Sequence, residues 1–90
     1  MPIEWTARFE RDFDRLSPLL QDRVERVVTL LDERREHPSL HLKRLRRFPG
    51  FWELRVTDEH RILLIVKSDL FTLMAIGKHE ILERFKRQPV

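Results

Sequence analysis

The chain has 90 residues, of which 37% are charged and 41% are hydrophobic, and it contains no cysteine. This length allows one modest hydrophobic core, so we expect a single domain over residues 1–90. The absence of cysteine excludes disulfides and thiolate metal sites, and no apolar run approaches the roughly 18 residues of a membrane-spanning helix.

The net charge of +3 is divided unevenly along the chain. Residues 1–36 contain seven Lys and Arg against nine Asp and Glu, whereas residues 37–90 contain eleven against six. A basic half favours an anionic partner such as nucleic acid, although a merely arginine-rich surface gives the same count. The first 14 residues lack the basic start and apolar run of a signal peptide, so we expect a cytoplasmic protein.

The first half predicts an edge strand followed by two helices. "PIEW" at residues 2–5 is short and alternating and begins at a proline, as edge strands do. A short amphipathic helix is predicted next from three apolar residues at helical spacing: Phe9, Phe13 and Leu16. Ser17 and Pro18 supply the N-cap and first residue of a second helix. Pro38 should end that helix near Glu36, so the two helices form a hairpin.

The second half changes to the two-residue period of strands. "FWELRV" at 51–56 alternates, and "RILLIVK" at 61–67 is the continuous apolar run of a strand covered on both faces. A tight turn at 68–69 leads into "LFTLMAIG", and the tail from residue 78 predicts one or two helical turns. The fold class is α+β. An N-terminal strand and helical hairpin pack on one face of an antiparallel sheet, in the order β-α-α-β-β-β with a C-terminal helical turn.

The alternation within residues 51–56 predicts which side chains meet the helices. Three apolar side chains share one side of the strand and should face the helices: Trp52, Leu54 and Val56. Glu53 and Arg55 then point to the opposite face, which is the natural place for a site. This inference depends only on the geometry of a strand.

Four elements between residues 39 and 82 read "LKRL", "PGFWELRV", "EHRILLIV" and "IGKHEIL". Their order and spacing resemble those of the RelE/ParE toxins of bacterial toxin–antitoxin pairs, although no single element is specific. The N-terminal strand and helical hairpin also occur at the expected place. The resemblance therefore covers nearly the whole chain and implies a RelE-like fold.

The resemblance implies a toxin of a type II toxin–antitoxin system, with a cognate antitoxin as its partner. The RelE, HigB and YafQ branch implies an endoribonuclease that cuts messenger RNA on the ribosome without a metal or other cofactor. The ParE branch implies a DNA gyrase inhibitor without nuclease activity, and an attenuated member would only bind its antitoxin. The fold alone does not fix the activity, so the branch depends on the site residues, which favour the nuclease.

Metal-free RNA cleavage needs a base, an acid and cations around the phosphate. His79 resembles the histidine of YafQ-type nucleases and is the candidate acid or base, unless it only caps the last strand. Arg55 occupies the family's strand-arginine position and is expected to clamp a phosphate. An ion pair with Glu53 or Glu59 is the alternative role of Arg55.

Three residues of the expected hairpin turn are further candidates. By its spacing, Glu59 resembles the acidic residue of YafQ-type members, as a base or as the group that orients His79, and Glu53 is the alternative carboxylate. Arg61 occupies another recurring arginine position, where phosphate contact and structural pairing are both open. His60 lies at a position commonly aromatic in the family, so we expect it to stack or simply to belong to the hairpin.

Basic residues are expected to bind the RNA backbone: Lys43, Arg44, Arg46, Arg47, Lys78, Arg84 and Lys86. The alternative is that they form solvated surfaces. Lys43 most closely matches the family's cation before the glycine turn. If residues 41–47 are extended, alternate side chains face opposite ways, so the four cations there cannot all reach one phosphate.

Two further features limit the chemistry. The chain has no tyrosine, whereas many RelE nucleases use a C-terminal one, and this departure favours a histidine-based variant. Phe85 can stack on a base but cannot transfer a proton. His37 and His41 are four residues apart, but Pro38 prevents the helix that would aim both at one ion, so we expect no metal.

Overall fold

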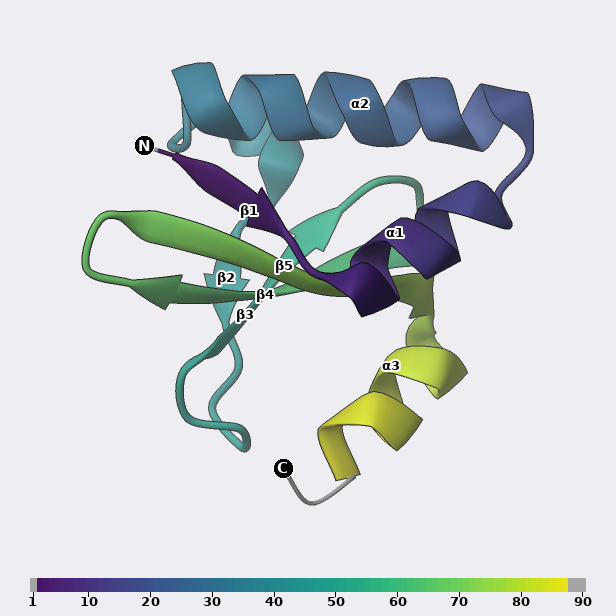
Figure 1. Ribbon diagram of the computed structural model, residues 1–90. Helices are drawn as coiled ribbons and strands as arrows, with labels where there is room; N and C mark the ends of the chain where they lie inside the picture. The colour runs from purple at the N-terminus through teal and green to yellow at the C-terminus, as the bar shows by residue number, and fades with distance from the viewer. Residues whose placement is uncertain (1, 88–90) are drawn as a thin grey trace.

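The computed structural model describes residues 2–87, with side chains described as far as Phe85. The elements in chain order are β1 (Ile3–Trp5), α1 (Ala7–Asp14), α2 (Pro18–Glu33), the 3₁₀ turn η1 (Pro38–Leu40), β2 (Lys43–Arg44), β3 (Phe51–Arg55), β4 (His60–Lys67), β5 (Leu70–Lys78) and α3 (His79–Arg87). Figure 1 shows α2 over one side of the sheet and α3 toward the other, with α1 beside β5. The α+β architecture predicted from the sequence is confirmed.

The five strands form one sheet in the order β1-β5-β4-β3-β2. The strands from β2 to β5 are antiparallel to their neighbours. β1 runs parallel to β5, with Ile3 opposite Phe71. The predicted antiparallel sheet is therefore a mixed one, because no tight turn joins β1 to β5 and sets their relative direction.

The helical hairpin begins as predicted and ends earlier. The Oγ atom of Ser17 accepts the backbone N–H of Leu20 at 3.3 Å, with Pro18 as the first helical residue. α2 ends at Glu33, three residues before the predicted end at Glu36. The chain leaves the helix at Arg34, where the backbone φ is −146° and ψ is 71°.

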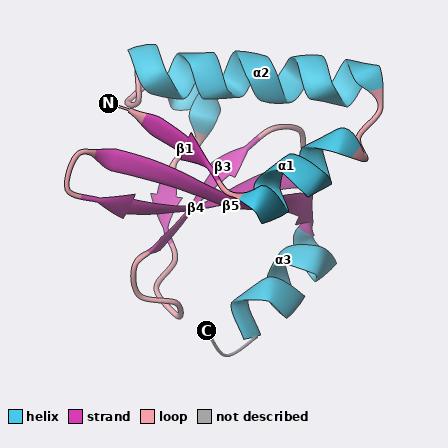
Figure 2. Ribbon diagram, in the orientation of Figure 1, coloured by secondary structure: helices cyan, strands magenta, loops and turns pink. Residues whose placement is uncertain are grey.

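Apolar side chains pack on both faces of the sheet. The helix-hairpin face is built on Leu54, Ile62 and Leu64, which pack with buried residues of α1 and α2. The α3 face is built on Phe51, Leu63 and Ala75, which pack with Leu82 and Phe85 of α3. β4 is thus covered on both faces, as its apolar run predicts. Figure 2 shows the strands of the sheet lying between the helices.

The C-terminal segment is a helix of nine residues, longer than the one or two turns predicted. Leu82 is fully buried on the α3 face, and Phe85 packs beside it. Ile81, the other apolar residue of the helix, is 44% exposed. Its side chain instead lies over Gly77, where an added Cβ would come within 3.0 Å of it. The face predicted to be open is therefore partly covered by α3.

A bulge in β5 changes which residues face each side. Leu63 pairs with Ala75 and Leu64 pairs with Leu73, so one residue of β5 is left between the two pairs. Leu73 and Ile76 consequently both face the helix hairpin, although they are three residues apart. Ala75 faces α3. The bulge therefore places Leu73 and Ile76 in the same core, with Ala75 in the opposite one.

Candidate functional site

The strand register aligns several predicted site residues in one row across the α3 face. Arg55 pairs with Arg61, and Arg61 pairs with Gly77 on β5. The side chains of this row point away from the helix hairpin, because the adjacent Leu54 and Ile62 are buried in the helix-hairpin core. The predicted orientation of Arg55 is therefore confirmed.

His41 stands at the end of the same row. β2 pairs with β3 through Lys43 and Glu53, and the same register carried two residues further brings His41 opposite Arg55. The Nε2 atom of His41 lies 3.4 Å from Nη1 of Arg55. An arginine can only donate, so Nε2 of His41 accepts in this contact and the ring proton belongs on Nδ1. The register of the β2–β3 hairpin was the signal in the sequence that could have identified His41.

Arg55 keeps unused hydrogen-bonding capacity. Its Nε atom is buried and has no hydrogen-bond partner among the side chains that the structure describes. The alternative predicted for Arg55, an ion pair with Glu53 or Glu59, does not occur among them. Its side chain makes one long contact, with His41. An arginine carries several N–H donors in a planar fork, so this guanidinium can still accommodate an anion.

Arg61 is held by protein groups. Its Nη1 atom donates to the backbone oxygen of Thr57 and, at 3.1 Å, to that of His60. Its Nε atom lies 3.6 Å from a carboxylate oxygen of Glu53. Glu53 is only 12% exposed and also lies 3.9 Å from Nζ of Lys43. Of the two roles left open for Arg61, the structure therefore shows structural pairing.

The β3–β4 turn (residues 56–59) is braced by its own hydrogen bonds. The Oγ1 atom of Thr57 accepts the backbone N–H groups of Glu59 and His60. The hydroxyl proton of Thr57 then points to Nδ1 of His60, 3.1 Å away, which places the ring proton of His60 on Nε2. Glu59 is exposed and its carboxylate lies 3.7 Å from Nζ of Lys78. Glu59 thus pairs with a cation of β5, and His60 belongs to the hairpin.

His79 lies at the same end of the sheet as Arg55, on the first turn of α3. Its side chain is 79% exposed, and its Nε2 atom lies 3.6 Å from the Glu83 carboxylate, one turn further along α3. The row on the α3 face thus brings His41, Arg55 and Arg61 together. His79 lies beside that row, where the chain leaves β5.

The basic run of residues 43–47 is divided between two faces, as its alternation predicts. Lys43 lies on the α3 face beside Glu53. Arg44 lies on the other face, with its guanidinium 5.2 Å from the centre of the Trp52 ring. Arg46 and Arg47 are exposed in the turn that follows β2, and Arg84 is exposed on α3. The side chain of Lys86 lies outside the described residues.

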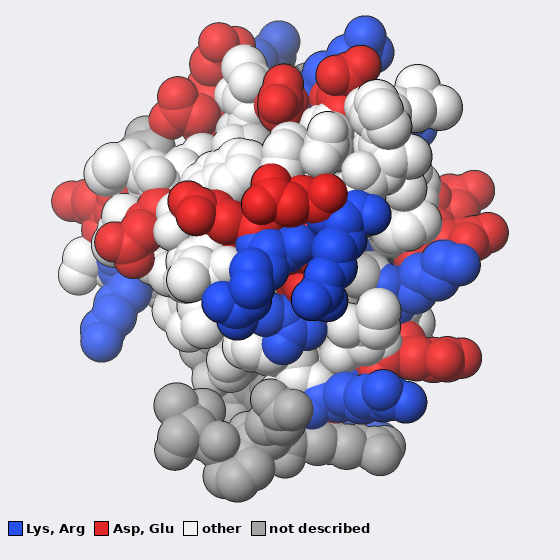
Figure 3. All heavy atoms as spheres, turned by 45° about the vertical axis from the view of Figure 1, so that its right-hand side comes forward, with Lys and Arg blue, Asp and Glu red and all other residues white. Residues whose placement is uncertain are grey.

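The side of the molecule that carries α1 and α3 is mixed in charge. Figure 3 shows a compact group of Lys and Arg side chains there, bordered by a row of Asp and Glu side chains. Part of this mixture is the pair formed by Arg8 and Asp12, whose Nε and Oδ1 atoms lie 3.0 Å apart. An anionic partner would therefore meet local groups of cations on this side.

The described part of the chain offers neither a metal-ligand cluster nor a membrane-spanning helix. Residues 2–87 contain no group of three or more His, Asp or Glu side chains placed to hold a metal ion. His37 and His41 have separate partners, since Nδ1 of His37 accepts from Ser39 and Nε2 of His41 meets Arg55. Within the same range, no helix has the length and apolar character needed to cross a membrane.

Comparison with solved structures identifies the class of protein that has this fold. The chain superposes on the YoeB/ParE toxin from Agrobacterium tumefaciens with a TM-score of 0.74 and 18% identity, covering 88% of this chain and 99% of that one. YafQ from E. coli gives a TM-score of 0.73 with 16% identity, over 89% and 94% of the two chains. RelE in the RelB–RelE complex from Methanococcus jannaschii gives 0.71 with 12% identity, over 91% and 96%. The fold is that of the RelE/ParE toxins.

The sequence itself identifies the family. The model of the ParE toxin of the type II toxin–antitoxin system parDE matches residues 3–82. The chain therefore belongs to the ParE toxin family of type II toxin–antitoxin systems. The membership in the RelE/ParE superfamily that the order of motifs predicts is confirmed. A search of the curated proteins gives no match.

Proposed function

We propose that this toxin inhibits translation by cutting messenger RNA on the ribosome, without a metal ion, at a phosphate held by Arg55. The observation that carries the proposal is the buried Nε of Arg55, which has no partner among the described side chains. A buried unpaired donor costs about 1–3 kcal/mol. A phosphodiester presents two oxygens that match the planar fork of a guanidinium, so RNA would satisfy this group.

His41 is the base in this proposal. Its Nε2 atom lies 3.4 Å from Arg55 and carries no proton in that contact. With a phosphate on Arg55, Nε2 would take the proton of the neighbouring 2′-hydroxyl. The 2′-oxygen then attacks phosphorus and the bond to the 5′-oxygen breaks, which leaves a 2′,3′-cyclic phosphate. Arg55 stabilises the charge that develops on the phosphate oxygens.

His79 is the acid that protonates the departing 5′-oxygen. It lies at the same end of the sheet as Arg55, and its Nε2 atom is 3.6 Å from the Glu83 carboxylate. Its exposure suits a group that meets a large substrate. Lys43 lies on the α3 face beside Glu53 and would contact a neighbouring phosphate. Lys78, at the end of β5 and paired with Glu59, would contact a phosphate further along the RNA.

A cognate antitoxin is the second partner in this proposal. Several of the structures similar to this chain are complexes, among them the E. coli DinJ–YafQ toxin–antitoxin complex and the RelB–RelE complex from Methanococcus jannaschii. Their existence supports an antitoxin that neutralises this toxin. Acidic side chains of such a partner would pair with the cations that RNA otherwise contacts.

The test is primer extension on messenger RNA that has been translated in a reaction to which the purified toxin was added. We expect discrete cuts with the wild type and none with Arg55→Ala. His41→Ala and His79→Ala should each lower the cutting rate by about a hundredfold or more. Arg34→Ala, an exposed arginine at the end of α2, is the matched control and should cut normally. Intact transcripts with the wild-type toxin would disprove the nuclease.

DNA gyrase inhibition is the second candidate function, and the match to the ParE toxin model favours it. A gyrase inhibitor would leave transcripts intact and produce gyrase-linked DNA breaks. The same preparation of toxin added to a gyrase supercoiling reaction would detect this activity. A toxin inactive in both assays, yet bound by its antitoxin, would be an attenuated member that only binds its partner.

A further inference from the structure

We propose that the hollow between α2 and the β3–β4 turn binds one nucleobase of the RNA, with a preference for guanine. The inference rests on the proposed nuclease function and adds base recognition to it. The hollow has a volume of about 650 Å³, within the range of roughly 300–1,000 Å³ that small-ligand pockets occupy. Arg55 contributes to the lining of the hollow at the end of β3, although its side chain points to the α3 face, so a base bound there would lie at the end of the sheet that carries Arg55.

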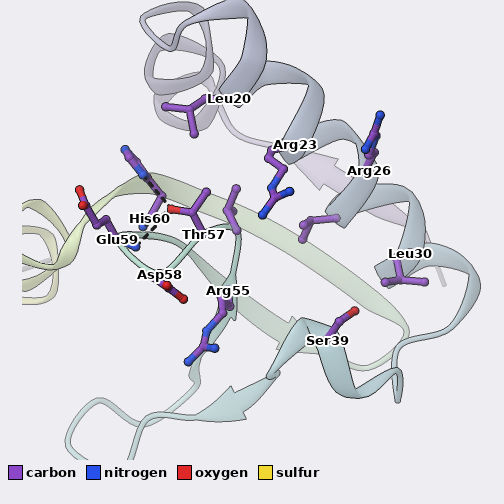
Figure 4. Close-up of a pocket in the computed structure, with 12 residues that line it drawn as sticks. Leu20, Arg23, Arg26, Leu30, Ser39, Arg55, Thr57, Asp58, Glu59 and His60 are labelled. Atoms are coloured by element: carbon purple, nitrogen blue, oxygen red, sulfur yellow. Dashed lines mark hydrogen bonds between the residues drawn. The ribbon is translucent and has the colours of Figure 1, made fainter.

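The walls of the hollow combine an apolar floor with a few charged groups. Its apolar lining residues come from α2 and the end of β3: Leu20, Val27, Leu30 and Val56. Figure 4 shows Arg23 reaching from α2 toward the hollow, with Asp58 and Arg55 on the opposite side. A flat aromatic base suits such a floor, since its faces are apolar and its edge is polar.

The β3–β4 turn forms a wall that is already ordered. The backbone N–H groups of Val56 and Thr57 both donate to the carbonyl of His60, at 3.0 and 3.2 Å. Arg61 donates to the carbonyl of Thr57 from behind. Asp58 is therefore presented by a turn whose neighbouring residues are held in place, which lowers the entropy cost of binding a ligand.

Two charged side chains of the hollow, those of Arg23 and Asp58, have no hydrogen-bond or ion-pair partner among the described residues. A nucleotide satisfies both, because its phosphate is an anion and its base offers N–H donors to a carboxylate. An acidic peptide would pair with Arg23 but would be repelled by Asp58. The pairing of opposite charges across the hollow thus favours RNA over an acidic protein segment.

The carboxylate of Asp58 determines which base fits. An ionised carboxylate only accepts hydrogen bonds, and its two oxygens can take two parallel N–H groups. Guanine presents two adjacent donors, on its ring N1 and its exocyclic amino group. Adenine and cytosine present one amino group beside an acceptor, and uracil presents one N–H between two carbonyls. Guanine alone can make the paired contact.

The test uses isotopically labelled toxin and two 2′-O-methylated trinucleotides, UGU and UAU, which cannot be cleaved at the 2′-position. We expect UGU to bind about tenfold more tightly than UAU, the discrimination of one paired contact. NMR signals of residues 20–30 and 56–60 should shift on binding. Asp58→Asn should remove the preference, and Asp69→Asn, in the turn at the other end of β4, should keep it.

Equal affinity of the wild type for UGU and UAU would overturn the proposal, and so would a preference that survives in Asp58→Asn. A synthetic peptide of alternating Glu and Leu that shifts the same signals in preference to either trinucleotide would assign the hollow to a protein partner. Binding of the trinucleotides does not require cleavage. Tight binding of UGU together with intact messenger RNA would therefore contradict the proposed nuclease and leave the base site standing.

Discussion

The Oδ2 atom of Asp12 accepts the backbone N–H of Ile76 at 3.1 Å, so a side chain of α1 completes the hydrogen bonding of β5. β1 pairs with β5 only as far as Leu73 and leaves the rest of that edge without a strand. Nε of Arg8 donates to both oxygens of the same carboxylate, at 3.0 and 3.1 Å. The guanidinium of Arg8 also lies 5.4 Å from the ring centre of Phe85 on α3. One carboxylate and its arginine thus link α1, β5 and α3.

Replacing Asp12 with Ala should lower the free energy of unfolding by about 1–3 kcal/mol, because it leaves the N–H of Ile76 unpaired. Urea denaturation measures the change. Asp14→Ala is the matched control, since Asp14 is an exposed residue of the same helix. Its effect should stay within about 0.5 kcal/mol. Equal losses in the two variants would show that the bond to Ile76 contributes nothing.

The close approach of α3 to Gly77 predicts a coupled pair of substitutions. A Cβ at Gly77 would lie 3.0 Å from Cβ and Cγ2 of Ile81. Gly77→Ala should therefore push α3 off the sheet and lower stability by about 1–3 kcal/mol, as overpacking does. Ile81→Ala in the same chain should restore part of the loss, because it removes Cγ2 and Cδ1 of residue 81 and leaves only its Cβ in the close contact. A double-mutant cycle with amide exchange of α3 measures the coupling, and additive effects would refute it.

The carboxylate of Glu53 lies beside two cations, Lys43 and Arg61, and its removal should lower the stability of the fold more than the removal of Lys43. Glu53→Gln leaves Arg61 without its charged partner in a site that is mostly screened from solvent. We expect a loss of about 1–2 kcal/mol in denaturation. Lys43→Ala should cost less than about 1 kcal/mol, because the side chain of Lys43 is largely exposed. The reverse order of the two losses would contradict this assignment.

We expect Arg55 to lower the stability of the free protein while it serves RNA cleavage. Arg55→Met removes a buried donor that has no partner while keeping an apolar stem, so the variant should be as stable as the wild type or about 1 kcal/mol more stable. It should nevertheless lose RNA cleavage. Arg61→Met is the contrast, since it removes contacts to Thr57, His60 and Glu53 and should destabilise the fold. A strongly destabilised Arg55→Met would mean that Arg55 is a structural residue.

His41 can be tested without disturbing its backbone. Its φ of 47° lies in the left-handed region, which asparagine tolerates better than most residues. His41→Asn should therefore retain stability and lose cleavage by about a hundredfold or more. His37→Asn, in the same loop, is the matched control, because asparagine also serves as a cap for η1. Normal cutting by His41→Asn would exclude His41 as the base.

Local signals in the sequence predicted most of the fold. Ser17 and Pro18 mark the start of α2 because capping depends on immediate neighbours. The alternation in residues 51–56 predicted the orientation of Arg55 because side chains of a strand must alternate. The parallel direction of β1 was missed, since it depends on residues nearly seventy positions away. The predicted end of α2 at Glu36 was wrong, because the backbone already departs from helical dihedral angles at Arg34, four residues before Pro38.

The candidate site was less predictable because its residues compete for partners in three dimensions. Two roles were open for Arg61, phosphate contact and structural pairing. Its contacts with carbonyl groups of the turn and with Glu53 show the structural pairing. The contact of His41 with Arg55 depends on the register of a strand only two residues long. The covering of the α3 face depends on the packing of Leu82 and Phe85 against Leu63, Ala75 and Phe51, which lie far from them in the sequence. Each of these three contacts forms only when the whole chain is packed, so local sequence patterns could not predict it.

The bulge in β5 also determines where this chain can change in length. Deleting the residue between Leu73 and Ala75 would restore a regular ladder and leave every later residue on its present face, because Leu73 and Ala75 already lie on opposite faces. Deleting Ile76 would instead reverse the facing of every later residue of the strand and put Gly77 against the helix hairpin, where it would leave a void. An insertion in the turn at Ser68 and Asp69 changes no facing on either strand. Homologous chains that keep this packing should vary in length at that turn and at the bulge, and keep the spacing from Ala75 to Gly77 constant.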